Sequence, residues 1–157
     1  MARAPALANQ MADRLVTLFQ TIDNVADANK WLSKPLDVHR EFRTRDLTIG
    51  VTPLIAIECH GWKSSGRGAS QHEKLADFEI HCVTRGPTKA EETAINVASD
   101  VETAIMQDEH LAGLLTEEIL EIVVVFNVEL SQAVGLCVFT VTFQPKADFD
   151  HSTATPS

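Results

Sequence analysis

The sequence of residues 119–144 is ILEIVVVFNVELSQAVGLCVFTVTFQ, and its pattern decides the fold class. On both sides of residues 131–135, apolar residues recur at every second position, which is typical of β-strands with one apolar face. Gly135 can supply the positive φ that a short chain reversal needs. We therefore predict two antiparallel strands. The apolar face of the first contains Leu120, Ile122, Val124, Phe126, Val128 and Leu130.

Two amphipathic helices are predicted to cover such a sheet. Residues 6–22 place apolar side chains at spacings of three and four, directly after Pro5, which suits a first helical turn. Residues 89–107 repeat that spacing. Thr88 before this segment and Glu91 in its first turn have the separation of a capping box. The intervening residues 23–36 are rich in turn formers, so we predict a connection there.

Three further strands are predicted between the helices. Residues 37–46 are polar and suit a sheet edge. Residues 54–60 and 78–83 alternate in polarity and suit a pair of neighbouring strands. The Gly/Ser-rich residues 63–70 between them are predicted to form a mobile loop.

The fold class that follows is α+β, a single mostly antiparallel sheet covered by two helices in the order α-β-β-β-α-β-β. A chain of 157 residues that is 45% hydrophobic suits one domain with its own core. We place this domain at residues 1–145. Residues 146–157 lack periodicity and are predicted to be a disordered C-terminal tail.

Composition excludes several classes of function. The net charge of −9 disfavours tight binding to DNA or RNA, because that affinity depends on cations that contact phosphates. No apolar run approaches the roughly 18 residues of a membrane span, and no signal segment opens the chain, so we expect a soluble protein that is not exported. Cys59, Cys82 and Cys137 are expected to be free thiols in a reducing compartment.

Cysteine and histidine stand side by side twice, as Cys59 with His60 and His81 with Cys82. Adjacent residues on a strand point to opposite faces, and no CxxC or HxxxH spacing is present, so we predict neither a zinc site nor a Cys–His nucleophile pair.

No other motif predicts catalysis. Glu117, Glu118 and Glu121 are interpreted as a solvated strand entrance. The glycines around residue 66 lack the Gly-Lys-Ser/Thr ending of a phosphate loop. We therefore predict that the protein is not an enzyme and has no cofactor and no metal.

Charge is distributed unevenly along the chain. Basic residues concentrate in the first half, at Arg40, Arg43, Arg45, Lys63, Arg67 and Lys74. Acidic residues concentrate later, at Asp108, Glu109, Glu117, Glu118, Glu121 and Glu129. Two dissimilar faces on one subunit suit a head-to-tail contact that closes into a ring. The alternative is a solvated surface with chance asymmetry, because surface ion pairs are individually weak.

The order of elements resembles that of the tail terminator, or tail completion, proteins of long-tailed bacteriophages, including lambda-like phages. The resemblance extends to about residue 145. It rests on the N-terminal helix, the Leu54-Ile55-Ala56-Ile57 strand after Pro53, the Gly/Ser-rich loop, the Phe78-Glu79-Ile80-His81-Cys82-Val83 strand, the Thr88 helix and the closing hairpin.

This resemblance implies a structural virion protein without catalysis that caps the tail tube and joins it to the head. Its partners would be further copies of itself in a ring, a hexamer in that family, together with the tail tube protein and a head connector or adaptor protein. DNA would only pass through the lumen, where acidic side chains would keep its phosphates from sticking. The protein would lie in the virion tail, and in the host cytoplasm during assembly, with no membrane partner.

Two alternatives remain open. One is a head–tail joining, or neck, subunit of similar build. The other is a small metal- or ligand-binding α+β domain that uses His60, His81 and the cysteines. Under the ring interpretation we predict an assembly surface that includes residues 119–129, because Val123 and Val125 leave apolar area on the polar face of that strand. The predicted interface residues are Arg40, Arg43, Arg45, Lys63, Arg67, Glu121, Val123, Val125 and Glu129.

Overall fold

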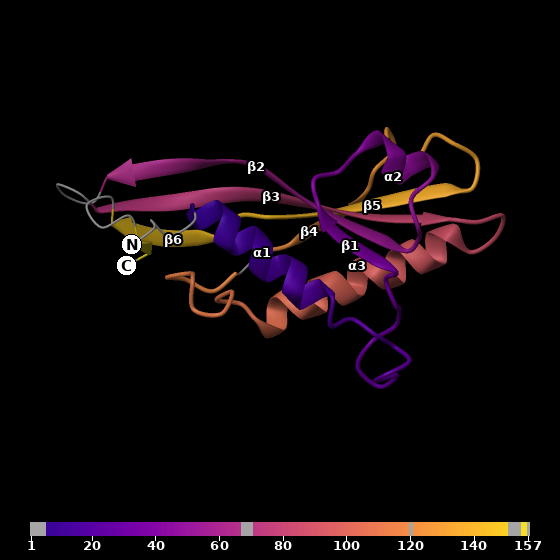
Figure 1. Ribbon diagram of the computed structural model, residues 1–157, viewed down its shortest axis with the longest axis horizontal. Helices are drawn as coiled ribbons and strands as arrows, with labels where there is room; N and C mark the ends of the chain where they lie inside the picture. The colour runs from indigo at the N-terminus through magenta and orange to yellow at the C-terminus, as the bar shows by residue number, and fades with distance from the viewer. Residues whose placement is uncertain (1–5, 67–70, 120, 151–154, 157) are drawn as a thin grey trace.

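One mixed β-sheet with two helices packed on a single face forms the protein (Figure 1). The structure is a computed structural model that describes residues 6–66, 71–119, 121–150 and 155–156. The elements are α1 (Leu7–Phe19), β1 (Asp37–Arg40), α2 (Thr44–Thr48), β2 (Leu54–Gly66), β3 (Gln71–Arg85), α3 (Ala90–Gln107), β4 (Val123–Phe126), β5 (Leu136–Phe143), β6 (Lys146–Asp150) and β7 (Thr155–Pro156). The predicted α+β class, with one sheet and two covering helices, is confirmed.

The sheet is organised around β3, its longest strand. The strand order is β1-β2-β3-β5-β4, and β3 also pairs with β6, which in turn pairs with β7. One half of β3 pairs with β5 and the other half with β6. Only β1 and β2 are parallel, and the other pairs are antiparallel. The sheet is therefore mostly antiparallel, as predicted.

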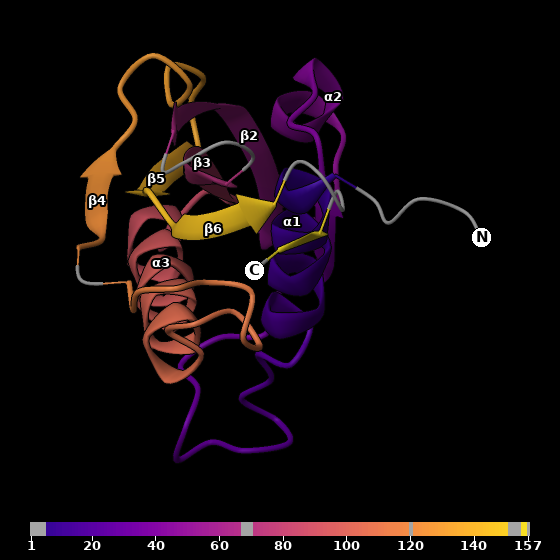
Figure 2. The ribbon, with the colours of Figure 1, turned by 90° about the vertical axis from the view of Figure 1, so that its left-hand side faces the viewer.

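The main core lies between α1, α3 and one face of the sheet (Figure 2). Alternate residues of β2, β3 and β5 point into it, because side chains on a strand change face at every position. The sheet contributes Ile55, Ile57, Phe78, Ile80, Cys82, Val141 and Phe143. The stripe of α3 contains Ala94, Val97, Ala98 and Val101, whose small side chains let the helix lie close to the sheet.

The reversal before β5 ends at Gly135 as predicted, but it begins at residue 127 instead of residue 131. Gly135 has a φ of 76°, and a Cβ at this position would lie 2.8 Å from the carbonyl oxygen of Gly86. Any other residue would be both strained and in collision there.

The hairpin between β2 and β3 differs from the prediction. Residues 63–66, which include Lys63, belong to β2 and pair with β3, so a mobile loop is wrong for them. Residues 67–70, which include Arg67, lie outside the described residues. Polar residues can form this strand because the backbone pairing needs no apolar side chains, and because the Lys74 ammonium lies 5.3 Å from the Trp62 ring centroid.

The predicted disordered tail is wrong for Lys146–Asp150. This segment forms β6, paired with β3, and Ala147 and Phe149 are buried in the main core. β7 follows at Thr155–Pro156, and the rest of the predicted tail lies outside the described residues. A five-residue strand with two inward side chains is too short for its period to be recognised from sequence.

Three boundaries also differ. The edge strand β1 ends at Arg40, and α2 occupies Thr44–Thr48, where the buried Asp46 carboxylate accepts a hydrogen bond from the Arg43 N–H at 2.8 Å. β4 is four residues long instead of extending over residues 119–130. The residue before α3 is Lys89, with a φ of 63° and no capping hydrogen bond from a side chain, so the predicted Thr88 cap is wrong. The element order is therefore α-β-α-β-β-α-β-β-β-β.

Candidate functional site

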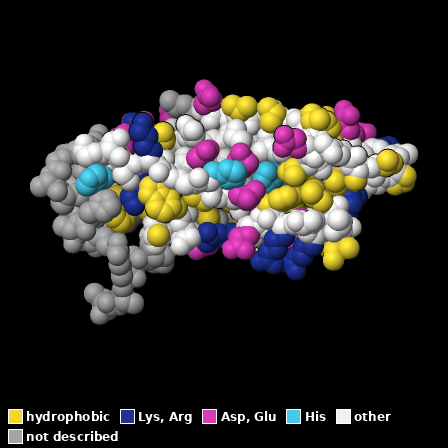
Figure 3. Space-filling view, turned by 90° about the horizontal axis from the view of Figure 1, so that it is seen from above, with side chains coloured by type: hydrophobic (Ala, Val, Ile, Leu, Met, Phe, Trp, Pro, Cys, Tyr) yellow, Lys and Arg dark blue, Asp and Glu magenta, His cyan; other side chains and the backbone are white. Residues whose placement is uncertain are grey.

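The face of the sheet opposite α1 and α3 is only partly covered. The α2 segment packs on one part of it, over a small second core of Leu54, Ala56, Val83, Leu136 and Val138. Figure 3 looks onto this face and shows histidine and acidic side chains together near its middle, with hydrophobic side chains close by. The candidate functional residues lie on this face and along the two edges of the sheet.

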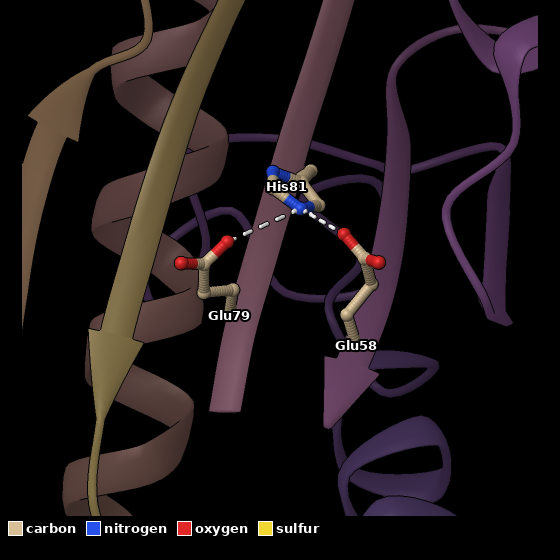
Figure 4. A group of neighbouring side chains, drawn as sticks. All are labelled: Glu58, Glu79 and His81. Atoms are coloured by element: carbon tan, nitrogen blue, oxygen red, sulfur yellow. Dashed lines mark hydrogen bonds and ion pairs between the residues drawn. The ribbon is translucent and has the colours of Figure 1, made fainter. Parts of the chain in front are cut away.

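Four of them form what we call the Glu–His cluster: Glu58 and His60 on β2, and Glu79 and His81 on β3. Glu58 and Glu79 are direct partners in the β2–β3 register. The His81 Nε2 atom lies 2.5 Å from Glu58 Oε1 and 3.8 Å from Glu79 Oε2 (Figure 4). The His60 Nε2 atom lies 3.2 Å from Glu79 Oε2 and 3.9 Å from Glu58 Oε1. Both imidazoles therefore reach the same two carboxylates.

The surroundings of His81 hold its ring in place. Only 3% of the residue is exposed, and the Phe42 ring packs beside it with the two centroids 4.6 Å apart. Its Nδ1 atom lies 3.2 Å from Thr140 Oγ1, which also accepts a hydrogen bond from the Asn127 side-chain amide at 3.0 Å. Nδ1 and Nε2 are therefore both in polar contacts, which fix the orientation of the ring.

The cysteines take no part in this cluster. Cys82 is buried in the main core and Cys59 packs against it, whereas His60 and His81 contact the carboxylates on the other face. The prediction that neighbouring cysteine and histidine residues face opposite ways is confirmed.

The sequence did not lead us to predict that the Glu58 and Glu79 carboxylates belong to the Glu–His cluster. A Glu-x-His pattern occurs on both strands, as Glu58-Cys59-His60 and Glu79-Ile80-His81, and it is the signal that could have identified them. Residues two apart share a face of a strand, so each pattern places a carboxylate and an imidazole side by side.

The β4 edge of the sheet is apolar and exposed. β4 is the last strand of the order and pairs only with β5 among the described strands. Val123 and Val125 are 43% and 48% exposed, and the Phe126 side chain is also exposed, at 47%. The predicted apolar area at Val123 and Val125 is therefore confirmed, whereas the prediction that Phe126 and Val128 lie on the face toward the core is wrong, because both are exposed. Glu121 before the strand and Glu129 after it are exposed and make this edge acidic.

The β1 edge carries arginines interspersed with the acidic residues Asp37, Glu41 and Asp46. Arg40 ends β1, and the exposed Arg43 and Arg45 follow it at the start of α2. Arg40 donates hydrogen bonds to Asp13 and Asn9, and Arg43 to Glu41, so part of this charge is used within the subunit.

Exposed apolar residues accompany these arginines. Leu36, Ile49 and Val51 are exposed, and the Leu36 N–H donates to the Pro53 carbonyl oxygen at 2.8 Å, which places the segments before β1 and β2 side by side. The predicted interface residues that the structure describes are therefore divided between two opposite edges of the sheet, with Lys63 apart from both on the outer half of β2.

An acidic groove of about 430 Å³ lies beside β4. Its lining includes Leu75, Asp77, Glu117, Glu118, Glu121 and Lys146. The Lys146 ammonium lies 3.1 Å from a Glu73 oxygen and 3.4 Å from a Glu117 oxygen, and the hydrogen bond to Glu73 raises the pKa of Lys146 above its usual value. The glutamates of the predicted strand entrance are exposed, which agrees with their interpretation as solvated groups.

The three cysteines are free thiols and are expected to differ in reactivity. Burial raises the pKa of the Cys82 thiol, and burial followed by the nearby Glu91 carboxylate raises that of Cys137. Reaction with Ellman's reagent is expected to modify only Cys59 rapidly in the folded protein, and all three in urea. Rapid modification that persists in Cys59→Ser would contradict this predicted order of reactivity.

The free energy of unfolding should also fall as the pH rises above 9.0, because thiols ionise at a lower pH in the unfolded chain than in the folded one.

Among the described residues, no helix is long and apolar enough to cross a membrane. No protein-family model matches the chain, and the comparison with curated proteins found no significant match. Function therefore has to be argued from the geometry of the face and edges described above.

Proposed function

We propose that the protein is a structural subunit of a bacteriophage tail that assembles head to tail into a ring, caps the tail tube and joins it to the head. The observation that carries this proposal is the pair of dissimilar sheet edges. The β4 edge exposes Val123 and Val125 between acidic residues, and the β1 edge exposes Leu36, Ile49 and Val51 near arginines. Resemblance to the tail terminator proteins supports the same function.

The physical argument concerns complementarity. A two-fold dimer through β4 would place that edge against itself and bring its glutamates together. A head-to-tail contact instead places the acidic β4 edge against the arginines of the β1 edge, with apolar side chains between them that leave water on association. Repetition of one such contact closes into a ring when its rotation permits.

The remaining parts of the proposal follow from this assembly. The ring is a hexamer, as in the family that the chain resembles, and one of its faces binds the tail tube protein while the other binds the head connector or adaptor. The glutamates of the acidic groove are suited to repel DNA that passes through the lumen. The subunit itself performs no catalysis. Binding assays with tail tube protein and with head adaptor protein separate this function from that of a neck subunit.

Replacing Val125 with Asp is expected to abolish ring formation and leave the fold intact. The side chain is half exposed in the isolated subunit, so a carboxylate there costs little until a partner covers it. Size-exclusion chromatography with light scattering, together with negative-stain imaging in the presence of phage tail tubes, measures assembly. Ile95→Asp, on an equally exposed apolar position of α3, is the matched control and should assemble normally. Unfolding of Val125→Asp would show instead that this face belongs to the core.

A charge-reversal pair tests which edges meet. Arg45→Glu and Glu129→Arg should each weaken association at least about tenfold, because each places like charges together. The double variant should recover most of the loss. Glu102→Arg, an exposed position on α3, controls for net charge. A wild-type chain that stays monomeric at every concentration, with or without tail tubes, would overturn the proposal.

A further inference from the structure

We infer that the Glu–His cluster is a binding site for one divalent transition-metal ion, with zinc as the best match. Glu58, Glu79 and His81 supply three ligands, whose donor atoms all lie within 4.8 Å of one another. His60 supplies the fourth. This inference stands on the geometry of one subunit and does not depend on the ring.

The spacing of the donor atoms fits a tetrahedral ion. Zinc bonds of about 2.0–2.1 Å place neighbouring ligand atoms about 3.3 Å apart. The four contacts between imidazole nitrogens and carboxylate oxygens in the cluster are 2.5, 3.2, 3.8 and 3.9 Å. These values lie on both sides of the tetrahedral spacing, and the rings of His60 and His81 both contact the two carboxylates that would hold the ion.

The sheet itself assembles the ligands. The β2–β3 register sets Glu58 opposite Glu79, and each Glu-x-His pattern adds an imidazole on the same face. A register shift between Cys59 and Gly61 falls at His60. Bulges of this kind re-aim a side chain, and here the His60 ring reaches both carboxylates.

The opposed carboxylates and the anchored His81 ring favour binding of a cation. Two carboxylates directly opposite each other on paired strands repel, so a positive charge between them is stabilising. His81 is anchored on its far side, where Nδ1 meets Thr140, and this kind of contact orients a metal-bound imidazole. When Nδ1 donates to Thr140, Nε2 presents its lone pair to the ion.

His39 also has two carboxylate neighbours, but its contacts do not converge on one point. His39 contacts Asp37 through Nδ1 at 3.2 Å and Asp46 through Nε2 at 3.1 Å. The two contacts use opposite ring nitrogens, so they cannot share one ion. In the Glu–His cluster every contact uses an Nε2 atom, and all of them point to the same carboxylates.

The ligand types select the metal. Two imidazoles and two carboxylates suit zinc and its first-row neighbours, whereas calcium and magnesium prefer oxygen ligands alone. Because the ligands come from two strands, the ion would also connect β2 to β3 and stabilise the hairpin.

Titration of zinc chloride into the full chain, after treatment with a chelator, tests the site by calorimetry. We expect one ion per chain with a Kd below about 10 μM, and a higher melting temperature with zinc. Glu58→Gln and His60→Ala remove ligands at partly exposed positions and should each raise the Kd at least about tenfold. His81→Gln should do the same if it folds. His110→Ala, an exposed histidine outside the cluster, is the matched control and should bind normally.

X-ray absorption at the zinc edge provides an independent readout. Only nitrogen and oxygen neighbours are expected, and Cys59→Ser should leave the spectrum unchanged. Absence of binding at 100 times the expected Kd, sulfur in the coordination shell, or unchanged affinity in both Glu58→Gln and His60→Ala would overturn the inference. Failure of the ring assays would leave it intact, since these measurements use the single chain.

Discussion

Replacing Asp100 with Ala is expected to lower the free energy of unfolding by about 3–5 kcal/mol. Asp100 is a buried carboxylate on α3 that ties the connection of residues 23–36 to the helix. Its oxygens accept hydrogen bonds from the Leu32 N–H at 3.1 Å, the Ser33 N–H at 2.8 Å and the Ser33 hydroxyl at 2.6 Å. Alanine would leave these donors without an acceptor in a place that water reaches poorly, and urea denaturation measures the cost.

Two comparisons sharpen this prediction. Asp100→Asn keeps one carbonyl acceptor and should lose only part of the stability. Hydrogen exchange of the Leu32 and Ser33 amides should accelerate in Asp100→Ala more than that of β3 amides, because the connection is released first. Equal stability of Asp100→Ala and the wild type would mean that the connection is held by Trp31 packing in the core and not by the carboxylate.

Replacing Phe78 with Ala is expected to cost about 3–5 kcal/mol, as for other fully buried aromatic side chains. Phe78 lies on the central strand β3, has no exposed surface, and stacks on Phe143 of β5 with the ring centroids 5.8 Å apart. Both helices pack on this face of the sheet, so a cavity here weakens the main core directly. Calorimetric melting temperature and urea midpoint both measure the loss.

Phe126→Ala is the matched control for that substitution. Phe126 also contacts a phenylalanine of β5, Phe139, at a centroid distance of 5.6 Å, but it lies on the edge strand and is half exposed. The loss should therefore be about 1 kcal/mol or less, since little area leaves water. A larger effect at Phe126 than at Phe78 would contradict the placement of the core between the helices and the inner strands.

Local pattern was sufficient for α3 and for the β3 segment around Phe78, but not for residues 119–130, where β4 covers only four residues. The helix predicted at residues 89–107 is observed at Ala90–Gln107, and the alternation around Phe78 correctly separates the core face of β3 from the open face. Two short elements were also missed. α2 has five residues and β6 has five, which is less than the length over which a period can be recognised. Residues 146–150 form a strand through pairing with β3, with Ala147 and Phe149 in the core.

One candidate site was predicted from the sequence and the other was not. Exposed apolar side chains at Val123 and Val125 could be predicted, because the alternation leaves them on the mixed face. The Glu–His cluster was missed because cysteine and histidine were weighed as ligands and the glutamates two residues before each histidine were not. Its convergence also depends on a register shift near His60 that no local pattern indicates.

The sequence by itself determined that this chain is an α+β protein with one sheet, two covering helices and free cysteines, because alternation and helical periodicity are properties of neighbouring residues. Only the tertiary structure decided that the exposed valines of β4 and the arginines near β1 occupy opposite edges of that sheet, and that Glu58, Glu79, His60 and His81 meet on one face. The physical reason is strand register. A shift of one residue moves every side chain to the other face, and register is set by contacts between segments far apart in the chain.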